Sequence, residues 1–155
     1  LDKFLYWHQQ LMAESLGKKG KGFLPSISKA PKDHHSLLQL YLDGPKDKLF
    51  YIFSAGNEKD EKIKSQFLKK KQNFLNNKSL SQIKEAQKNA FIKALKKNAI
   101  PFREFKIKKI NEQTLGELFS YFMLEISLIG KLLDINPFDQ PAVEQVKVST
   151  KRFLT

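Results

Sequence analysis

The stretch that decides the fold is Leu49-Phe50-Tyr51-Ile52-Phe53, a short and uninterrupted apolar run. It is bounded by Asp47-Lys48 before it and by Gly56-Asn57 after it, and this short length with polar borders favours a strand over a helix. A continuous apolar run, without alternating polar positions, is typical of a strand buried on both faces of a parallel sheet. We therefore expect a parallel sheet that includes residues 49–53.

A second strand is expected from Phe102 to Ile110, where apolar and charged residues alternate imperfectly, as they do nearer the edge of a sheet. An amphipathic helix precedes it and ends at Pro101. The apolar positions of this helix are Ile83, Ala86, Ala90, Phe91, Ala94 and Leu95. Residues 57–80 are the most polar part of the chain, so we expect a solvated connection there, with a helical turn around Phe67 and Leu68.

Helices are also predicted on both sides of this strand-helix-strand region. The first helix ends at the glycines at positions 17, 20 and 22, and a second begins with Asp33 as its N-cap and closes at Gly44-Pro45. The apolar side of the first helix consists of Leu1, Phe4, Leu5, Leu11 and Met12.

Two further helices complete the pattern. Thr114 and Glu117 have the spacing of a capping box and would open an apolar helix that runs to about Leu133. After Asn136-Pro137, Asp139 or Gln140 can cap a last helix with Pro141 in its first turn. Because strands and helices alternate along the chain, we expect one layered α/β domain.

The net charge of +12 raises the question of an anionic partner, either nucleic acid or a membrane surface. Lys and Arg total 28, but Arg103 and Arg152 are the only arginines. Arginine forms the paired hydrogen bonds that read guanine and phosphate, so its scarcity argues against a specific nucleic-acid reader. A lysine-rich solvated surface is the preferred interpretation.

The absence of cysteine excludes disulfides, Cys-zinc sites and thiol nucleophiles, and it fits a reducing cytoplasm. No signal peptide is visible at Leu1, and a chain that opens without Met suggests a piece of a longer protein. The apolar stretch 118–133 contains Glu125 and Lys131 and is shorter than the roughly 20 residues that span a bilayer. It is interpreted as a buried helix.

Lys147 is the most informative charged residue. Projected at about 100° per residue, it falls at the edge of the expected inward stripe of the last helix. That stripe consists of Val143, Val146, Thr150, Phe153 and Leu154. A lysine in this position must extend to water, pair with an anion or have a perturbed pKa, and position alone favours the first.

Gln10 and Glu14 share one face of the first helix, away from its apolar side, so they can reach a ligand together. A solvated face is the commoner explanation of such a pair, although Trp7 lies on the same side. His34-His35 follows the expected cap Asp33, where a helix N-terminus would hold His35 neutral and suited to proton transfer. Surface or cap histidines are commoner, and adjacent histidines make a poor metal pair.

The run Gly17-Lys18-Lys19-Gly20-Lys21-Gly22 has neither the spacing nor the strand-loop-helix setting of a phosphate-binding loop, and no GxSxG motif is present. The residues by themselves therefore lead to a glutamate, a histidine and a lysine on three separate elements, without a shared reaction.

Three segments, in order, make the sequence similar to the glucose-6-phosphate isomerase family. Residues 138–147, Phe-Asp-Gln-Pro-Ala-Val-Glu-Gln-Val-Lys, resemble the C-terminal signature of that family. Residues 9–18 resemble its glutamate-bearing helix, and residues 33–40 resemble its histidine segment. Residues 115–118 and 122–125 are also similar to family segments, whereas residues 57–80 match least.

The resemblance implies a role for each candidate. Glu14 would be the base that carries a proton between C1 and C2 through an enediol, which interconverts glucose 6-phosphate and fructose 6-phosphate. His35 would assist ring opening and come from the partner subunit of a homodimer. Lys147 would act at the ring-oxygen and O1 side, so the resemblance reverses the preference for a solvated lysine. Gln10 and Gln140 would line the substrate site, and family members need no metal or organic cofactor.

The chain also departs from the family pattern. His34 stands where many relatives have Gln, and Pro141-Ala142 replaces the Trp/Pro-Gly pair found in others. The family's phosphate-binding Ser/Thr loops and active-site arginine lie in an earlier region that this sequence does not contain, and neither Arg103 nor Arg152 matches that arginine.

The resemblance implies that residues 1–155 are the C-terminal part of a larger two-subdomain enzyme of glycolysis and gluconeogenesis. The implied fold is a three-layer αβα subdomain of the sugar-isomerase (SIS) type with a mostly parallel sheet. We expect a cytoplasmic isomerase that acts on a sugar phosphate, with neither nucleic acid nor membrane as partner. A non-catalytic sugar-phosphate-binding regulatory module is the alternative, and the retained Glu14, His35 and Lys147 disfavour it.

Overall fold

Residues 50–53 of the apolar run lie in a parallel sheet, as predicted, and Leu49 lies just before the strand. The computed structural model describes residues 1–56, 60–64 and 69–155, and its strands β1 (Phe50–Ala55) and β2 (Phe102–Ile107) pair in parallel. Phe50 faces Phe102 across the pair, and the register continues to Ala55 opposite Ile107. The sheet among the described residues has two strands, so each strand has an open edge, and residues 50–54 are half-buried instead of fully buried.

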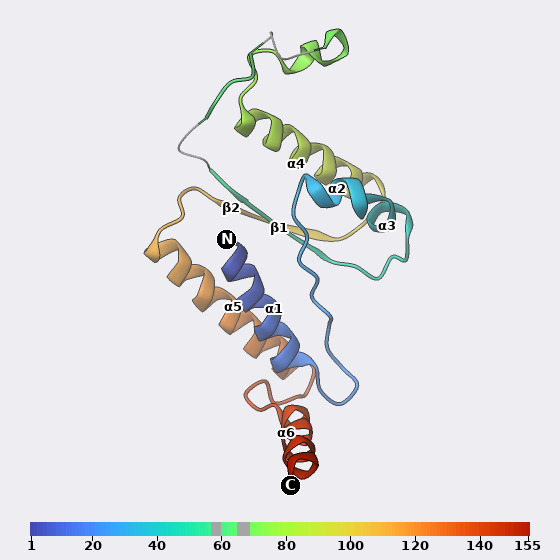
Figure 1. Cartoon of the computed structure of the whole chain (residues 1–155), viewed down its shortest axis with the longest axis vertical. Coiled ribbons are helices and arrows are strands. Elements are labelled where there is room, and N and C mark those ends of the chain that lie inside the picture. Colours follow the sequence, from blue (N-terminus) through green and yellow to red (C-terminus); the bar gives the residue numbers. More distant parts are fainter. Residues whose placement is uncertain (57–59, 65–68) are drawn as a thin grey trace. The chain divides into compact units, whose positions relative to one another are not determined.

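The chain divides into two compact units. Unit 1 comprises residues Leu1–Ile27 and Glu112–Thr155, and unit 2 comprises Ser28–Asn111. The elements of each unit can be followed by colour in Figure 1. The domain assignment over residues 1–155 stays a prediction.

Unit 2 is a β-α-β arrangement with two short helices before it. Helix α4 (Leu80–Lys97) joins β1 to β2 and is opened by Ser79, whose hydroxyl accepts a hydrogen bond from the Gln82 backbone N–H at 3.2 Å. Gln82 reciprocates by accepting from the Ser79 N–H at 3.0 Å, which completes a capping box. The helix ends at Asn98, before Pro101, so the predicted helix is confirmed and its stop lies slightly earlier.

The helix predicted after Asp33 is interrupted. Helix α2 (Lys32–Ser36) and helix α3 (Leu38–Asp43) are separated at Leu37, and Gly44 ends the second as expected. The prediction that Asp33 is an N-cap is wrong. Asp33 lies inside α2, and its carboxylate accepts a hydrogen bond from the Lys29 backbone N–H at 2.6 Å, so it stabilises the preceding loop.

Aromatic rings join these helices to the sheet. The ring of Phe50 on β1 lies 5.0 Å from that of Tyr41 on α3 and 5.6 Å from that of Phe91 on α4. Both helices therefore contact the sheet at Phe50. A 3-10 helix, η2 (Lys70–Leu75), lies in the polar connection before α4. The helical turn predicted around Phe67 and Leu68 lies outside the described residues.

Unit 1 is built on the packing of helix α1 (Asp2–Leu16) against helix α5 (Glu112–Leu132). Gly17 ends α1, as predicted. Helix α5 begins before Thr114, and the Glu117 carboxylate accepts from the Gln113 side chain at 3.1 Å. The capping box predicted at Thr114 is therefore wrong, because Thr114 already lies within the first turn.

A small core holds the end of α1 to the end of α5. Leu16, Ile126 and Ile135 are buried together. Partly buried side chains surround them: Leu11, Met12, Ile129 and Leu133. Gly130 leaves room for Pro137, because a Cβ at residue 130 would lie 3.0 Å from the proline ring. The connection after α5 is thus packed against the end of α5 itself and lies close to the core that α1 shares.

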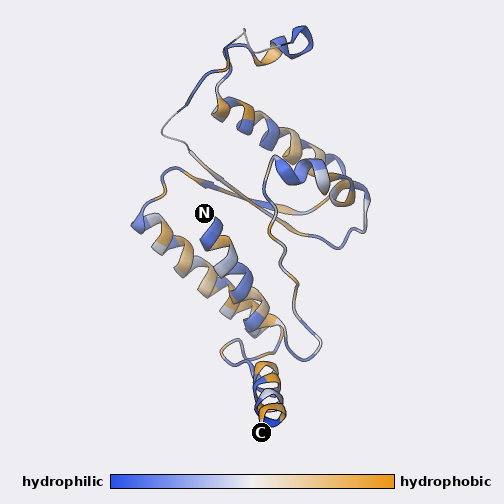
Figure 2. Cartoon of the chain, viewed as in Figure 1, coloured by the Kyte–Doolittle hydropathy of each residue, from blue (hydrophilic) through white to orange (hydrophobic). Residues whose placement is uncertain are grey.

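Helix α6 (Pro141–Leu154) follows, with Gln140 at its N-cap and Pro141 at its first position, as predicted. Its expected inward stripe is wrong, because every residue of α6 is exposed, including Val146 at 68% and Phe153 at 90%. No described residue packs closely enough against the apolar side of α6 to bury that side. Figure 2 shows apolar residues on both α5 and α6.

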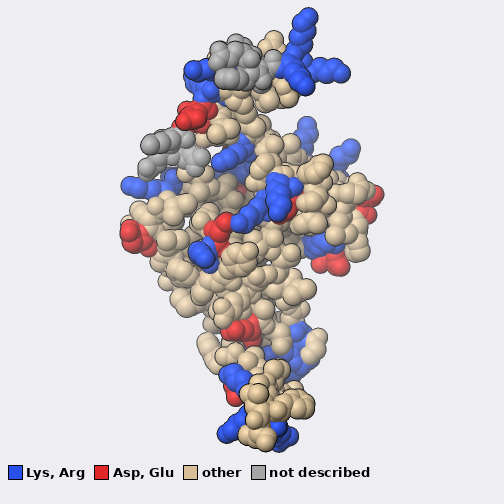
Figure 3. Space-filling model, in the orientation of Figure 1, with Lys and Arg blue, Asp and Glu red and all other residues tan. Residues whose placement is uncertain are grey.

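Basic side chains are distributed among acidic and uncharged ones on the face seen in Figure 3. Some are used within a unit: the Lys88 ammonium pairs with Glu85 at 2.9 Å and with Glu104 at 3.0 Å. Within the described part of the chain, no helix is both long and apolar enough to cross a membrane.

Candidate functional site

Gln10 and Glu14 lie side by side on the exposed face of α1, as their spacing predicts. The Gln10 amide nitrogen donates a hydrogen bond to Glu14 Oε1 at 3.0 Å. Trp7, on the same side of the helix, is half-buried and packs against the ring of Phe119 at 4.4 Å. Glu14 is exposed, so its carboxylate is open to solvent, and the Gln10 amide orients one of the carboxylate oxygens.

Gln140 lies near the end of α1 because its neighbour Asp139 contacts Lys18 there. Gln140 is exposed at the N-cap of α6 and makes no side-chain capping bond. The preceding residue, Asp139, forms an ion pair with Lys18 at 2.8 Å. Lys18 itself follows Glu14 by four residues. The Lys18 ammonium holds the pKa of the Asp139 carboxyl below its ordinary value. Unit 1 thus joins the start of α6 to the end of the helix that carries Glu14.

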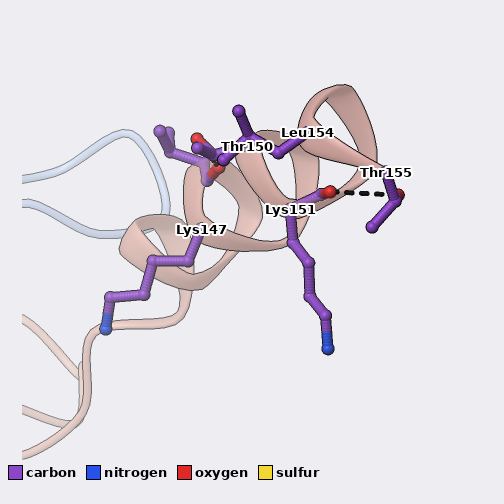
Figure 4. A pocket seen from close by; sticks show the side chains of 6 residues that line it. Lys147, Thr150, Lys151, Leu154 and Thr155 are labelled. Atoms are coloured by element: carbon purple, nitrogen blue, oxygen red, sulfur yellow. Dashed lines mark hydrogen bonds between the residues drawn. The ribbon is translucent and has the colours of Figure 1, made fainter.

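Lys147 lies two turns into α6 and is exposed. Its ammonium forms an ion pair with Glu144 at 2.6 Å, and 63% of each side chain is accessible. It borders a shallow depression lined by Val146, Lys147, Thr150, Lys151, Leu154 and Thr155. Figure 4 shows the Lys147 side chain extending away from Thr150 and Leu154. Lys147 therefore both extends to water and pairs with an anion, which are two of the three possibilities that its position in the sequence left open.

His35 belongs to unit 2, whereas Glu14 and Lys147 belong to unit 1. It is exposed and lies in the last turn of α2, a helix of five residues. The predicted placement of His35 directly after an N-cap is therefore wrong, because the helix begins at Lys32 and His35 lies in its last turn. His34 is the more buried of the two, and its ring lies 4.9 Å from that of Phe91.

Two features of unit 1 were missed in the sequence. The first is the contact between Lys18 and Asp139, which joins residues too distant along the chain for local spacing to reveal. The second is His8, which is 7% exposed and whose ring centre lies 4.3 Å from that of Phe122, with the two rings tilted against each other. Its position four residues after Phe4, on the apolar side of α1, was an available signal.

No group of three His, Asp or Glu side chains close enough to hold a metal ion occurs among residues 1–56, 60–64 and 69–155. The side chains described above are hydrogen-bonding and acid-base groups, so the chemistry they can carry is proton transfer and the binding of polar ligands.

Relatives of known name are found over the whole chain, although no family model matches. The chain is 36% identical to a probable glucose-6-phosphate isomerase of Methanococcus maripaludis, with 100% of the chain and 35% of that protein covered. It is 37% identical to the glucose-6-phosphate isomerase of Methanocaldococcus jannaschii, over 91% of the chain and 35% of that protein. The enzyme of Mycoplasmopsis synoviae is also 37% identical, over 93% of the chain and 34% of its own length.

A solved structure supports the fold. The hypothetical protein TT0462 of Thermus thermophilus matches with a TM-score of 0.82 and 28% identity, over 97% of this chain and 38% of that one. The chain spans about a third of the length of the relatives it matches. By its sequence, it is a homologue of that third of glucose-6-phosphate isomerase.

Proposed function

We propose that this chain is the C-terminal part of a glucose-6-phosphate isomerase, the enzyme that interconverts glucose 6-phosphate and fructose 6-phosphate. The observation that carries the proposal is the exposed Gln10–Glu14 pair on α1, in a chain whose relatives bear that name. The parallel β-α-β unit and the likeness to TT0462 support a fold of the three-layer sugar-isomerase type.

Glu14 is the proposed base. A carboxylate can remove the C2 proton of the open-chain aldose, so that the C2–H electrons form the C1–C2 double bond and the carbonyl electrons move to O1. The O2 hydroxyl proton passes to O1 in this enediol intermediate, and the negative charge moves to O2. The same carboxyl group returns the proton to C1, which gives the ketose and restores the carboxylate. The Gln10 amide holds Oε1, so we assign the proton to the other oxygen, Oε2.

Lys147 and Gln140 are proposed to bind the sugar, with Lys147 at the ring-oxygen and O1 side. Lys147 is paired with Glu144 in this structure. Exposed ion pairs of this kind contribute only about 0–1 kcal/mol, so the lysine can leave Glu144 for a substrate oxygen at little cost. Gln140 has its amide available at the N-cap of α6 because it makes no capping bond there.

His35 is proposed to assist ring opening and to reach the site from the partner subunit of a homodimer. Its exposed position on α2 is compatible with contact to a second copy. We expect the enzyme to act in the cytoplasm on an anionic sugar phosphate, without a metal or organic cofactor.

The test is Glu14→Gln in the full-length protein that carries this chain. The amide keeps the shape of the carboxylate but cannot accept the proton, so kcat should fall by about 10² to 10⁴. Exchange of the transferred hydrogen with deuterated water should be lost in parallel, while the circular dichroism spectrum and the unfolding midpoint remain unchanged.

The chain offers a matched control for this substitution. Gln113 and Glu117 form the same hydrogen-bonded pair on α5, with the amide 3.1 Å from Glu117 Oε1. Glu117→Gln should leave kcat within about twofold of the unsubstituted enzyme, because surface substitutions away from a site have small effects. Near-normal turnover in Glu14→Gln would remove Glu14 from the role of base, and substrate binding without any turnover in the unsubstituted protein would favour a regulatory module.

A further inference from the structure

The glycine- and lysine-rich loop after α1 is tied to the connection between α5 and α6. The Lys18 ammonium donates to the carbonyl oxygen of Asn136 at 2.5 Å and pairs with Asp139 Oδ1 at 2.8 Å. The Lys21 ammonium donates to the carbonyl oxygen of Leu133 at 2.5 Å. These two lysines of the glycine- and lysine-rich run therefore bind the protein's own oxygens.

Lys18 is the more enclosed partner of its ion pair. Its side chain is 9% exposed, against 53% for Asp139. An ammonium with so little access to water depends on its protein acceptors, because burying a charge without a partner is costly. Asp139 is further held by Asn136, whose amide donates to Oδ2 at 3.1 Å. The geometry of Asp139 is thus fixed by groups on both sides.

The contact lies between two residues assigned to substrate chemistry. Gln140 follows Asp139 directly, and Glu14 precedes Lys18 by four residues, with Lys18 just beyond the end of α1. The buried cluster of Leu16, Ile126 and Ile135 holds the neighbouring backbone of the same unit. A shift of Asp139 would therefore move Gln140 relative to Glu14 without disturbing that cluster.

We infer that Lys18 is a positioning residue of the isomerase site, which acts through Asp139 to hold Gln140 and the start of α6 at the end of the helix that carries Glu14. This inference rests on the proposed function. Lys18 does not bind the substrate phosphate, because its ammonium is enclosed and occupied by Asn136 and Asp139. Its effect is on the alignment of a bound sugar with the base, to which reaction rates are very sensitive.

The experiment compares Lys18→Met, Asp139→Asn and the double variant in the full-length enzyme. Each single variant should lower kcat roughly ten- to a hundredfold with a much smaller change in KM, because misalignment affects the reaction more than binding. The double variant should be no slower than the single ones, since either change already breaks the same contact. Lys18→Arg should recover part of the lost kcat because it keeps the charge.

Lys21→Met is the control, because it removes a lysine of the same loop with the same kind of carbonyl contact but no link to Asp139. It should keep kcat within about twofold, since it leaves the alignment of the site intact. Normal kcat and KM in Lys18→Met, or additive losses in the double variant, would overturn the inference.

If Lys18→Met does not fold, Asp139→Asn and Lys18→Arg test the positioning role of Lys18. A lowered kcat in Asp139→Asn together with partial activity in Lys18→Arg supports that role. A normal kcat in Asp139→Asn overturns it. Absence of isomerase activity in the unsubstituted protein would instead overturn the proposed function, and the positioning role with it.

Discussion

His8 shows what burial does to a single titratable side chain. The imidazole lies between α1 and α5, 7% exposed, against the ring of Phe122. Burial lowers the pKa of His8 below its ordinary value of about 6.5, and the nearby Glu125 carboxylate opposes this only in part. Neutral imidazole is thus the form that the folded chain prefers.

The stability of the chain should therefore depend on pH through His8. Below about pH 6.5 the unfolded chain binds a proton at this position more readily than the folded chain, so the free energy of unfolding falls as pH falls. The slope contributed by one such group is at most about 1.4 kcal/mol per pH unit. Above that pH both states are neutral at His8 and its contribution is constant.

Denaturant unfolding between about pH 5 and 7.5, on the unsubstituted chain and on His8→Phe, measures this effect. The variant keeps an aromatic ring in the aromatic surroundings and removes the proton site, so its stability should fall less steeply toward the acidic end. Identical slopes for the two proteins would show that His8 does not set the dependence.

At the scale of elements, the packing of α1 on α5 rests on aromatic contacts. Phe122 is fully buried, and its ring centre lies 5.8 Å from that of Phe4 and 4.3 Å from that of His8. Phe4 also meets Phe119 edge to face at 5.5 Å. Such pairs contribute beyond the burial of apolar area alone, so the helix pair depends strongly on this cluster.

Phe122→Ala should destabilise unit 1 by about 3–5 kcal/mol, because it removes a buried ring and leaves a cavity. Phe153→Ala is the matched control on α6, where the ring is 90% exposed, and its effect should stay within about 0.5 kcal/mol. The free energy of unfolding of both variants, measured in denaturant, gives the comparison. A loss below about 1 kcal/mol for Phe122→Ala would contradict the assigned packing.

At the scale of the whole molecule, the proposal combines residues from two copies of the chain in one site. Glu14 and Lys147 belong to unit 1 and His35 to unit 2, and the proposal takes His35 from a partner subunit. A closed two-fold dimer would then contain two equivalent sites, each with a glutamate from one subunit and a histidine from the other.

Mixed dimers test this arrangement directly. Full-length Glu14→Gln and His35→Ala subunits, each inactive alone, are co-expressed with different tags, and the hybrid dimer is purified. If His35 crosses between subunits, one site of the hybrid carries both substitutions and the other carries neither, so the hybrid should have about half the normal activity. A site made within one subunit would leave the hybrid as inactive as its parents.

The sequence by itself determined the positions of the main elements and the shared face of Gln10 and Glu14. Periodicity, apolar runs and glycines act within a turn or two of the chain, so β1, α4 and the ends of α1 and α3 could be predicted. The family resemblance was likewise contained in short segments, because they carry the residues assigned to the reaction.

Only the tertiary structure decided which charges and faces are used. Asp33 bonds back to Lys29 in the preceding loop and does not cap its helix, His8 is enclosed by a helix distant in sequence, and Lys18 meets Asp139 across most of the chain. Helix α6 has the predicted apolar periodicity, yet its side chains are exposed. Periodicity specifies that a face is apolar, whereas burial and ion pairing depend on what another part of the chain places against it.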